Sequence, residues 1–193
     1  MAILGPRKKI EYNDTIIGRV WIFPDNVDTD AISPGQYLDD LKATLMHTCE
    51  KINPNFLQNA EEGDIIIGGK NFGCGSSRES APNVLIQKGI VAIVAESFSR
   101  IFYRNCLAMG LPVLEIYGCQ SLAKEGEKVK IDIPLCEIEN LHTKEKMSGK
   151  KLPNILLEIL KEGGLEEQLL KELKQRAKKI GRASCRERVC VGV

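Results

Sequence analysis

The chain carries, at residues 64–79, the stretch DIIIGGKNFGCGSSRE, in which an apolar run gives way to a loop of glycine, cysteine, serine and arginine. Residues 64–69 have the β-branched composition of a strand, and residues 81–88 after the loop are typical of a helix. Glycine lets a loop adopt positive φ and approach a ligand closely. Because the first N–H groups of a helix attract anions, this order of segments predicts an anion-binding turn.

The alternation of strand and helix continues through the residues that follow. Residues 90–95 form a continuous apolar run, residues 98–108 have helical character, and residues 113–116 form another short apolar run. We therefore expect two consecutive βαβ units over residues 64–116, with parallel strands. Ligands bind beyond the carboxyl ends of such strands, so the position of the glycine–serine loop suits a binding site.

The two flanks of this unit predict further elements. Residues 16–23 indicate a strand, residues 24–30 a polar loop and residues 41–51 a helix. Residues 128–133 alternate polar and apolar side chains, as a half-exposed strand does. Further elements are expected as a strand at residues 137–141 and helices at residues 153–160 and 165–179. The sequence therefore predicts an α/β fold with parallel βαβ units and a β-rich flank.

Composition restricts the class of protein. The chain has 193 residues and a formal net charge of +1, which gives no reason to expect a nucleic acid or a membrane surface as partner. No apolar run reaches transmembrane length, and the first residues lack the apolar region of a signal peptide. We therefore expect a cytoplasmic protein of ordinary single-domain size.

Cysteine spacing argues against a metal bound by this chain. None of the seven cysteines forms a C-x-x-C pair, and the two histidines belong to no spaced ligand set. Seven is an odd number, and free, mostly buried thiols are expected. The sequence therefore predicts that this chain holds neither a structural zinc ion nor an iron–sulfur cluster by itself.

The end of the chain differs from the rest. Residues 180–193 resemble translated adaptor sequence and lack a periodicity that continues the preceding helix. We expect these residues to be a non-native, disordered tail, and residues 1–179 to form the domain.

Other interpretations of the glycine–serine loop are possible from the residues alone. Ser76 or Ser77 could simply cap the following helix, with Glu79 completing a capping-box-like turn. A dinucleotide loop fits poorly because the third glycine is missing, and a Walker-type phosphate loop would need Gly-Lys-Ser/Thr.

Three motifs resemble a known family. Residues 27–38, 71–79 and 96–105 look like the swivel domain of the aconitase superfamily, and more closely like the separate small subunit of 3-isopropylmalate dehydratase and homoaconitase. The resemblance covers roughly residues 19–171. It implies a swivel-type β/β/α domain.

The resemblance also implies an activity. The family dehydrates and rehydrates hydroxy acids that carry several carboxylates, as hydro-lyases that are active only when a small and a large subunit assemble, as a heterodimer or a heterotetramer. A [4Fe–4S] cluster is expected in the large subunit, and no cofactor is expected on this chain. The pathway implied first is leucine biosynthesis, through 3-isopropylmalate.

Site residues follow from the same motifs. By resemblance, Ser76 is the catalytic base, acting as an alkoxide, and Asp30 is a catalytic position that orients neighbouring hydrogen bonds. Ser77, Arg78 and Gly75 would bind substrate, since an arginine grips a carboxylate with two parallel hydrogen bonds. An alkoxide needs converging N–H donors and positive charge, which the helix N-terminus and Arg78 could supply in part.

Tyr37, Leu38 and Asp39 match the substrate-specificity loop of the family. In relatives the Tyr-Leu pair is often followed by Arg-Thr, whereas here Asp39-Asp40 stands there; Ser80 likewise replaces a common histidine. A carboxylate at this place would repel a third substrate carboxylate. An aspartate there favours 3-isopropylmalate, or a smaller methyl-substituted malate such as 2,3-dimethylmalate, as the substrate, and it disfavours homoaconitate. The small subunit of a 2,3-dimethylmalate or homoaconitate-type hydratase stays open as an alternative, and so does a non-catalytic anion-binding swivel module.

Overall fold

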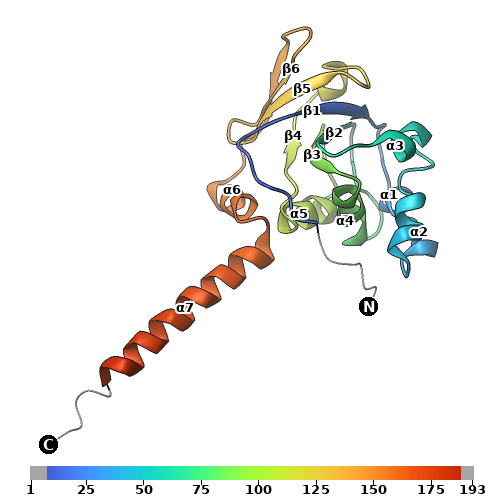
Figure 1. The fold of residues 1–193 in the computed structure, drawn as a ribbon. Helices are drawn as coiled ribbons and strands as arrows, with labels where there is room; N and C mark the ends of the chain where they lie inside the picture. The colour runs from blue at the N-terminus through green and yellow to red at the C-terminus, as the bar shows by residue number, and fades with distance from the viewer. Residues whose placement is uncertain (1–7, 188–193) are drawn as a thin grey trace, which may run out of the picture.

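A curled sheet of seven strands forms the centre of the molecule (Figure 1). The computed structural model describes residues 8–187, and the side chains of residues 8–177. The strand order is β4-β3-β2-β1-β5-β6-β7. The strands are β1 (Thr15–Ile22), β2 (Asp64–Gly68), β3 (Ile90–Ala95), β4 (Val113–Glu115), β5 (Lys128–Asp132), β6 (Glu137–Asn140) and β7 (Lys146–Ser148).

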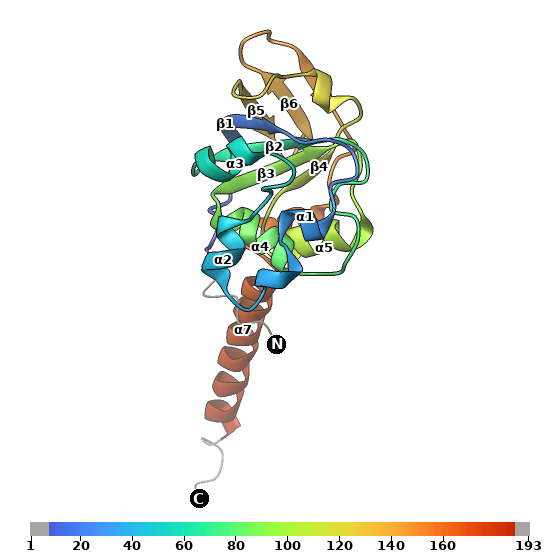
Figure 2. The same ribbon diagram turned by 90° about the vertical axis from the view of Figure 1, so that its right-hand side faces the viewer.

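One half of the sheet is parallel. Strands β1 to β4 pair in parallel with their neighbours, and β2 and β3 are almost entirely buried, as continuous apolar runs predict. Helix α4 (Ser80–Gln87) connects β2 to β3, and helix α5 (Arg100–Ala108) connects β3 to β4. The two helices lie side by side below the sheet (Figures 1 and 2). The two predicted βαβ units are therefore confirmed.

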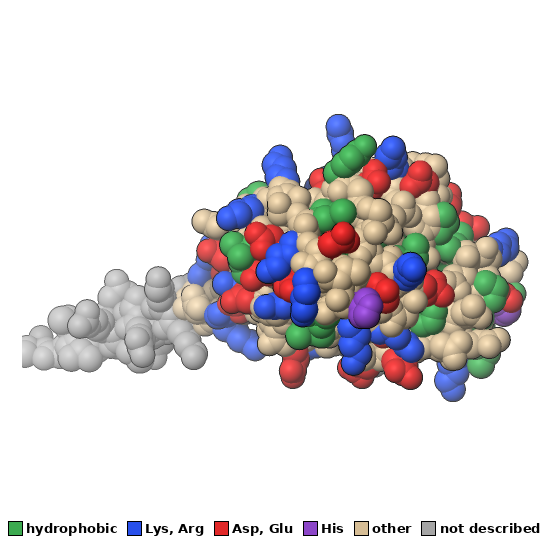
Figure 3. Space-filling model, turned by 90° about the horizontal axis from the view of Figure 1, so that it is seen from above, with side chains coloured by type: hydrophobic (Ala, Val, Ile, Leu, Met, Phe, Trp, Pro, Cys, Tyr) green, Lys and Arg blue, Asp and Glu red, His purple; other side chains and the backbone are tan. Residues whose placement is uncertain are grey.

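The other half of the sheet is antiparallel. Strand β5 pairs with β1 on one side and with β6 on the other, and β7 closes the edge. Side chains of β5 and β6 alternate between buried and more exposed positions, as the polar–apolar alternation predicts. Seen from above, this face carries basic and acidic side chains intermingled (Figure 3). The β-rich flank is thus confirmed, with β7 as a strand that the sequence did not indicate.

Short helices account for most differences from the expected elements. The predicted helix at 41–51 ends at Met46, since the backbone of the next residue, His47, is no longer helical, and the chain turns again at Cys49, whose φ is +58°. The polar loop expected to end at residue 30 instead contains the start of a short helix. Between β1 and β2 the helical segments are α1 (Thr29–Ile32), η1 (Gly35–Tyr37), α2 (Leu41–Met46) and α3 (Pro54–Asn59).

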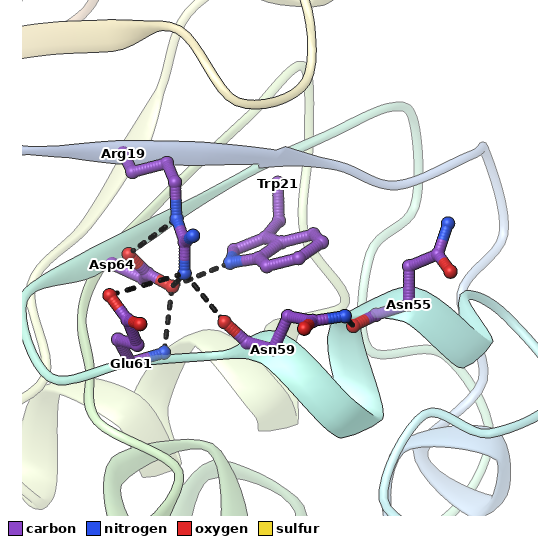
Figure 4. A network of polar contacts seen from close by, with 6 residues as sticks. All are labelled: Arg19, Trp21, Asn55, Asn59, Glu61 and Asp64. Atoms are coloured by element: carbon purple, nitrogen blue, oxygen red, sulfur yellow. Dashed lines mark hydrogen bonds and ion pairs between the residues drawn. The ribbon is translucent and has the colours of Figure 1, made fainter.

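The opposite end of the sheet from the glycine–serine loop is braced by a buried carboxylate (Figure 4). Asp64, the first residue of β2, accepts hydrogen bonds from Arg19 Nη2 at 2.8 Å, from Trp21 Nε1 at 2.7 Å and from the N–H of Glu61 at 2.9 Å. Arg19 also donates to the carbonyl of Asn59 at 2.6 Å. The network joins β1, β2 and the end of α3, so it holds the amino end of β2 in place.

The last helices leave the body of the molecule. After η2 (Cys119–Ser121) and the antiparallel strands, α6 (Asn154–Lys161) packs against α5, and α7 (Leu165–Glu187) projects away from the sheet (Figure 1). The backbone of residues 180–187 is helical, where the sequence led us to expect disorder, because alanine, arginine and glutamate there favour helix. Residues 188–193 lie outside the described residues. No helix within residues 8–187 is both long and apolar enough to span a membrane.

Candidate active site

Three loops meet at the carboxyl ends of β1, β2 and β3. The loop after β2 bonds to the loop after β1, since Gly73 N–H donates to the carbonyl of Val27 at 2.8 Å. It also bonds to the loop after β3, since Phe72 N–H donates to the carbonyl of Ser97 at 2.9 Å. Short parallel bridges thus extend the sheet beyond its strands. The glycine–serine loop is the middle one of the three, at the sheet edge where ligands bind in such folds.

Two glycines fit this loop to its neighbours. Gly73 has a φ of +74°, and a Cβ atom there would lie 2.1 Å from Cγ of Phe102, a buried ring of α5. Gly75 has a φ of +90°, and a Cβ atom there would lie 2.6 Å from the carboxylate of Asp28. Both positions therefore require glycine for backbone conformation and for space.

The backbone of Ser76 is held by a buried threonine. Ser76 N–H donates to Thr29 Oγ1 at 3.0 Å, and Thr29 Oγ1 donates to the carbonyl of Ser76 at 3.2 Å. Thr29 is buried, whereas Ser76 and Ser77 are exposed. The hydroxyl of Ser76 has no hydrogen bond within the described residues. The backbone of Ser76 is therefore fixed, and its hydroxyl lies at the surface, where a ligand or a partner protein can contact it.

The interpretation of Ser76 or Ser77 as a helix cap is wrong. Helix α4 begins only at Ser80, and its N-cap position is Glu79, whose side chain makes no capping bond. The residues before it stay outside the helix because Thr29 binds the backbone of Ser76. The helix N-terminus therefore begins four residues after the serine, and Ser80 instead bonds through its hydroxyl to Ser33 Oγ at 3.1 Å.

Asp30 and Arg78 form an ion pair beside the serine loop. Arg78 Nη1 donates to Asp30 Oδ1 and, at 3.5 Å, to the carbonyl of Ser33. The carboxylate also accepts the N–H of Gly35 at 3.0 Å. The hydrogen bond from Arg78, supported by that of Gly35, holds the pKa of Asp30 below its ordinary value. A charged carboxylate thus fixes the direction of the guanidinium.

The segment proposed as a specificity loop begins next to this ion pair. A Cβ atom at Gly35 would lie 3.1 Å from both terminal nitrogens of Arg78. Farther on, Tyr37 stacks on His47 with ring centroids 4.2 Å apart, and Leu38 ends the short helix η1. The side chain of Asp39 is exposed. Within the described residues, no hydrogen bond joins the side chains of Tyr37, Leu38 or Asp39 to the serines.

Asp40 has a structural role that the sequence did not reveal. Its carboxylate accepts the N–H groups of Lys42 at 2.8 Å and Ala43 at 3.3 Å, and so caps α2. Of the two neighbouring aspartates, Asp39 therefore has the side chain that is left for contact with a ligand.

Sequence reasoning missed the residues that support the site from beneath. Asp28 caps α1 by accepting the N–H of Asp30 at 2.6 Å. Ser99 donates to the carbonyl of Gly73 at 2.6 Å, and Asn105 Nδ2 lies 3.5 Å from the carbonyl of Ser77. The doublet of aspartates around Thr29 was the available signal, because such residues bind backbone groups in turns.

The described cysteines do not suit a metal cluster. No group of three or more histidine, cysteine, aspartate or glutamate side chains within the described residues is arranged to hold a metal ion. Cys74 lies in the glycine–serine loop, and burial, joined by the charge of Asp28, raises the pKa of its thiol. The other described cysteines are buried: Cys49, Cys106, Cys119 and Cys136.

Comparisons with known proteins agree on one family. Residues 50–117 match the model of the aconitase C-terminal domain. The chain is 47% identical to an isopropylmalate/citramalate isomerase small subunit of Methanocaldococcus jannaschii, over 82% of this chain and 95% of that protein. It is 46% identical to a methanogen homoaconitase small subunit of Methanothermobacter thermautotrophicus, over 82% of this chain and 92% of that protein.

A solved structure agrees with the fold. The crystal structure of a 3-isopropylmalate dehydratase from Methanocaldococcus jannaschii superimposes with a TM-score of 0.79 at 40% sequence identity, covering 86% of this chain and 99% of that one. A chain that is similar along nearly the whole length of such proteins shares their fold and general architecture.

Proposed function

The chain belongs to the family of 3-isopropylmalate dehydratase and homoaconitase small subunits, in the aconitase superfamily, and from this premise we propose how its residues act. It is a small subunit of a hydro-lyase that works together with a large subunit. Our proposal is that Ser76 is the general base, that Ser77 and Arg78 hold a substrate carboxylate, and that the substrate is 3-isopropylmalate or a close relative.

The observation that carries this proposal is the exposed serine on a fixed backbone beside a paired arginine. Thr29 holds the backbone of Ser76 in place, so little conformational entropy is lost when the Ser76 hydroxyl is positioned against the substrate. A serine hydroxyl is too weakly acidic to act as a base unless its alkoxide is stabilised by nearby donors or positive charge. Because helix α4 begins only at Ser80, we assign most of that stabilisation to Arg78 and to groups of the large subunit.

Arg78 is suited to bind a carboxylate. Within the described residues its hydrogen bonds use Nη1, which leaves other N–H groups of the guanidinium for a ligand. Asp30 holds the guanidinium in one orientation and is the residue we propose to organise this part of the site. We assign Gly75 to the substrate-contacting backbone; its positive φ and the Asp28 carboxylate beside it leave no room for another residue type there.

The iron–sulfur cluster is proposed to lie in the large subunit. Among the cysteines whose side chains are described, none belongs to a group arranged to hold a metal ion. When bound there, the cluster supplies a Lewis acid for the hydroxyl that leaves the substrate. This chain contributes the base and the carboxylate contacts, in a heterodimer or a heterotetramer.

Asp39 favours a substrate with an apolar substituent. Asp39 belongs to the loop that starts beside Arg78, and its side chain is exposed, so a third substrate carboxylate near it would be repelled. 3-Isopropylmalate, which would place the enzyme in leucine biosynthesis, and methyl-substituted malates satisfy this condition. The relatives include one named for isopropylmalate and citramalate and another named for homoaconitase, so homoaconitate is the alternative to test.

The test uses the enzyme assembled with the large subunit of the same organism under anaerobic conditions. We expect dehydration of 3-isopropylmalate or a methyl-substituted malate, and no turnover of homocitrate. Ser76→Ala should lower kcat by at least about a hundredfold with unchanged assembly. Ser148→Ala, at an exposed serine of β7, is the matched control. Near-normal turnover by Ser76→Ala would refute the role of Ser76 as the general base. If the wild type assembled with the large subunit but turned over none of these acids, a non-catalytic module would be favoured.

We propose that residues 1–179 form the native swivel domain and that residues 180–193 are a non-native tail. Helix α7 projects from the body, so its far end adds little to the core (Figure 1). Deleting residues 180–193 should leave the Tm of the subunit unchanged, and a loss of several degrees would show that the tail contributes to the fold.

A further inference from the structure

An apolar groove runs between three helices on the lower side of the molecule. It is lined by residues of α5, α6 and α7, which pack against one another. We call it the α5–α7 groove. Its lining includes Ile101, Arg104, Asn105, Leu156, Ile159 and Leu165.

Large apolar side chains of the groove are exposed to solvent. Ile101 of α5 is 47% exposed and Leu165 of α7 is 41% exposed. Leu156 and Ile159 of α6 are only partly buried between them. Contiguous apolar patches of this kind mark surfaces that another molecule covers.

Two arginines on α5 give the groove a basic edge. Arg100 and Arg104 are one helical turn apart, and both are exposed. Within residues 8–177 neither of them has an acidic partner, in contrast to Arg19 and Arg78, each of which is paired with an aspartate. A partner that presents acidic side chains would therefore be favoured at this edge.

The groove is continuous with the candidate active site. Asn105 lines the groove, and its Nδ2 atom lies 3.5 Å from the carbonyl of Ser77 in the serine loop. Ser76 and Ser77 are themselves exposed. A protein that covers the serines to complete the site must therefore extend over the Asn105 end of the groove.

We propose that the α5–α7 groove is the docking surface for the large subunit, which inserts an apolar side chain beside Ile101 and places carboxylates against Arg100 and Arg104. This inference rests on the proposed function, because it takes the large subunit as the protein that covers Ser76. The serines and the groove then form a single interface. Docking at the groove positions the serine loop over the partner's reaction centre.

The test measures assembly and chemistry separately. The Kd between the subunits is measured by biolayer interferometry, and kcat is measured at saturating small subunit with 3-isopropylmalate as substrate. Ile101→Glu should raise the Kd by about tenfold or more, as expected for a central apolar contact. Its kcat at saturation should stay within about twofold of the wild-type value. Leu135→Glu, at an exposed leucine between β5 and β6, is the matched control and should change neither quantity.

A second variant tests the charge. Arg104→Glu should also raise the Kd, by a factor that shrinks as salt is added, because an exposed charge pair is screened. Since Arg104 and Ile101 are exposed, both variants should retain the wild-type circular dichroism spectrum and Tm.

The outcomes separate the two proposals. Wild-type turnover with unchanged Kd for Ile101→Glu and Arg104→Glu would overturn the docking surface and leave the function intact. Variants that self-associate less but bind the large subunit normally would assign the groove to a second copy of this chain, which also overturns the inference. A wild type that fails to assemble with the large subunit at all would refute both proposals.

Discussion

Replacing Thr29 by valine tests whether the serine loop is held for catalysis. The substitution keeps the shape of a buried side chain but removes the hydroxyl that binds both the N–H and the carbonyl of Ser76, at 3.0 and 3.2 Å. Each lost hydrogen bond costs about 1 kcal/mol. Because Ser76 is exposed, water can take over its backbone groups, so we expect a total of about 1 to 2 kcal/mol in the free energy of unfolding.

The effect on turnover should be larger than the effect on folding. A displacement of the serine by about 1 Å can lower a rate about a hundredfold, so we expect Thr29→Val to lower kcat by roughly 10- to 100-fold in the assembled enzyme. Urea unfolding of the small subunit gives the stability, and turnover at saturating subunit and substrate gives kcat.

A matched control separates the two effects. Thr48 is also buried and donates its hydroxyl to a backbone carbonyl, that of Thr44, at 2.8 Å, but it lies away from the serine loop. Thr48→Val should cost a similar free energy of unfolding and leave kcat unchanged. If Thr29→Val turned over at the wild-type rate, or if both variants lost activity equally, the reasoning that Thr29 positions the base would be refuted.

Three further variants probe the fold and the ion pair. Asp64→Asn should lower the free energy of unfolding by about 2 to 3 kcal/mol, because a buried carboxylate with several hydrogen-bond donors loses its charge. It should not alter kcat, since Asp64 lies at the amino end of β2, away from the serine loop. A normal urea midpoint would argue against a stabilising role of the Asp64 network. Gly73→Ala should lower the free energy of unfolding by about 3 kcal/mol, because the alanine is strained at positive φ and its Cβ collides with Phe102. Both Tm and kcat should fall. A Tm equal to that of the wild type would show that the loop can move aside. The depressed pKa of Asp30 means that its pairing with Arg78 contributes stability above the ordinary pKa of an aspartate and loses it as the pH falls through the lower folded value. The urea midpoints of wild type and Asp30→Asn should therefore differ slightly between pH 7 and about pH 5 and converge only as the pH falls below about 4. A difference that did not narrow below about pH 4 would contradict the ion pair.

Regular segments were predictable because their signal is local. The buried runs of β2 and β3 and the alternation in β5 are periodic in sequence, so the strands were placed to within a few residues. Short helices such as α1 were missed, since a single turn leaves no periodic signal. The start of α4 was placed correctly, but the helix cap was not, because the backbone of Ser76 binds a residue distant in the sequence.

The sequence by itself determined the order of the βαβ units, the position of the glycine–serine loop at the end of a strand and the family, because these depend on local composition and on motifs in a fixed order. Only the tertiary structure decided which side chains meet. Thr29 and Ser76 are 47 residues apart, and Asp30 and Arg78 are 48 apart. They come together because β1 and β2 pair in parallel, which brings the loops at their carboxyl ends side by side. Hydrogen bonds between such loops depend on strand register and on backbone direction, and neither leaves a periodic trace in the amino-acid sequence.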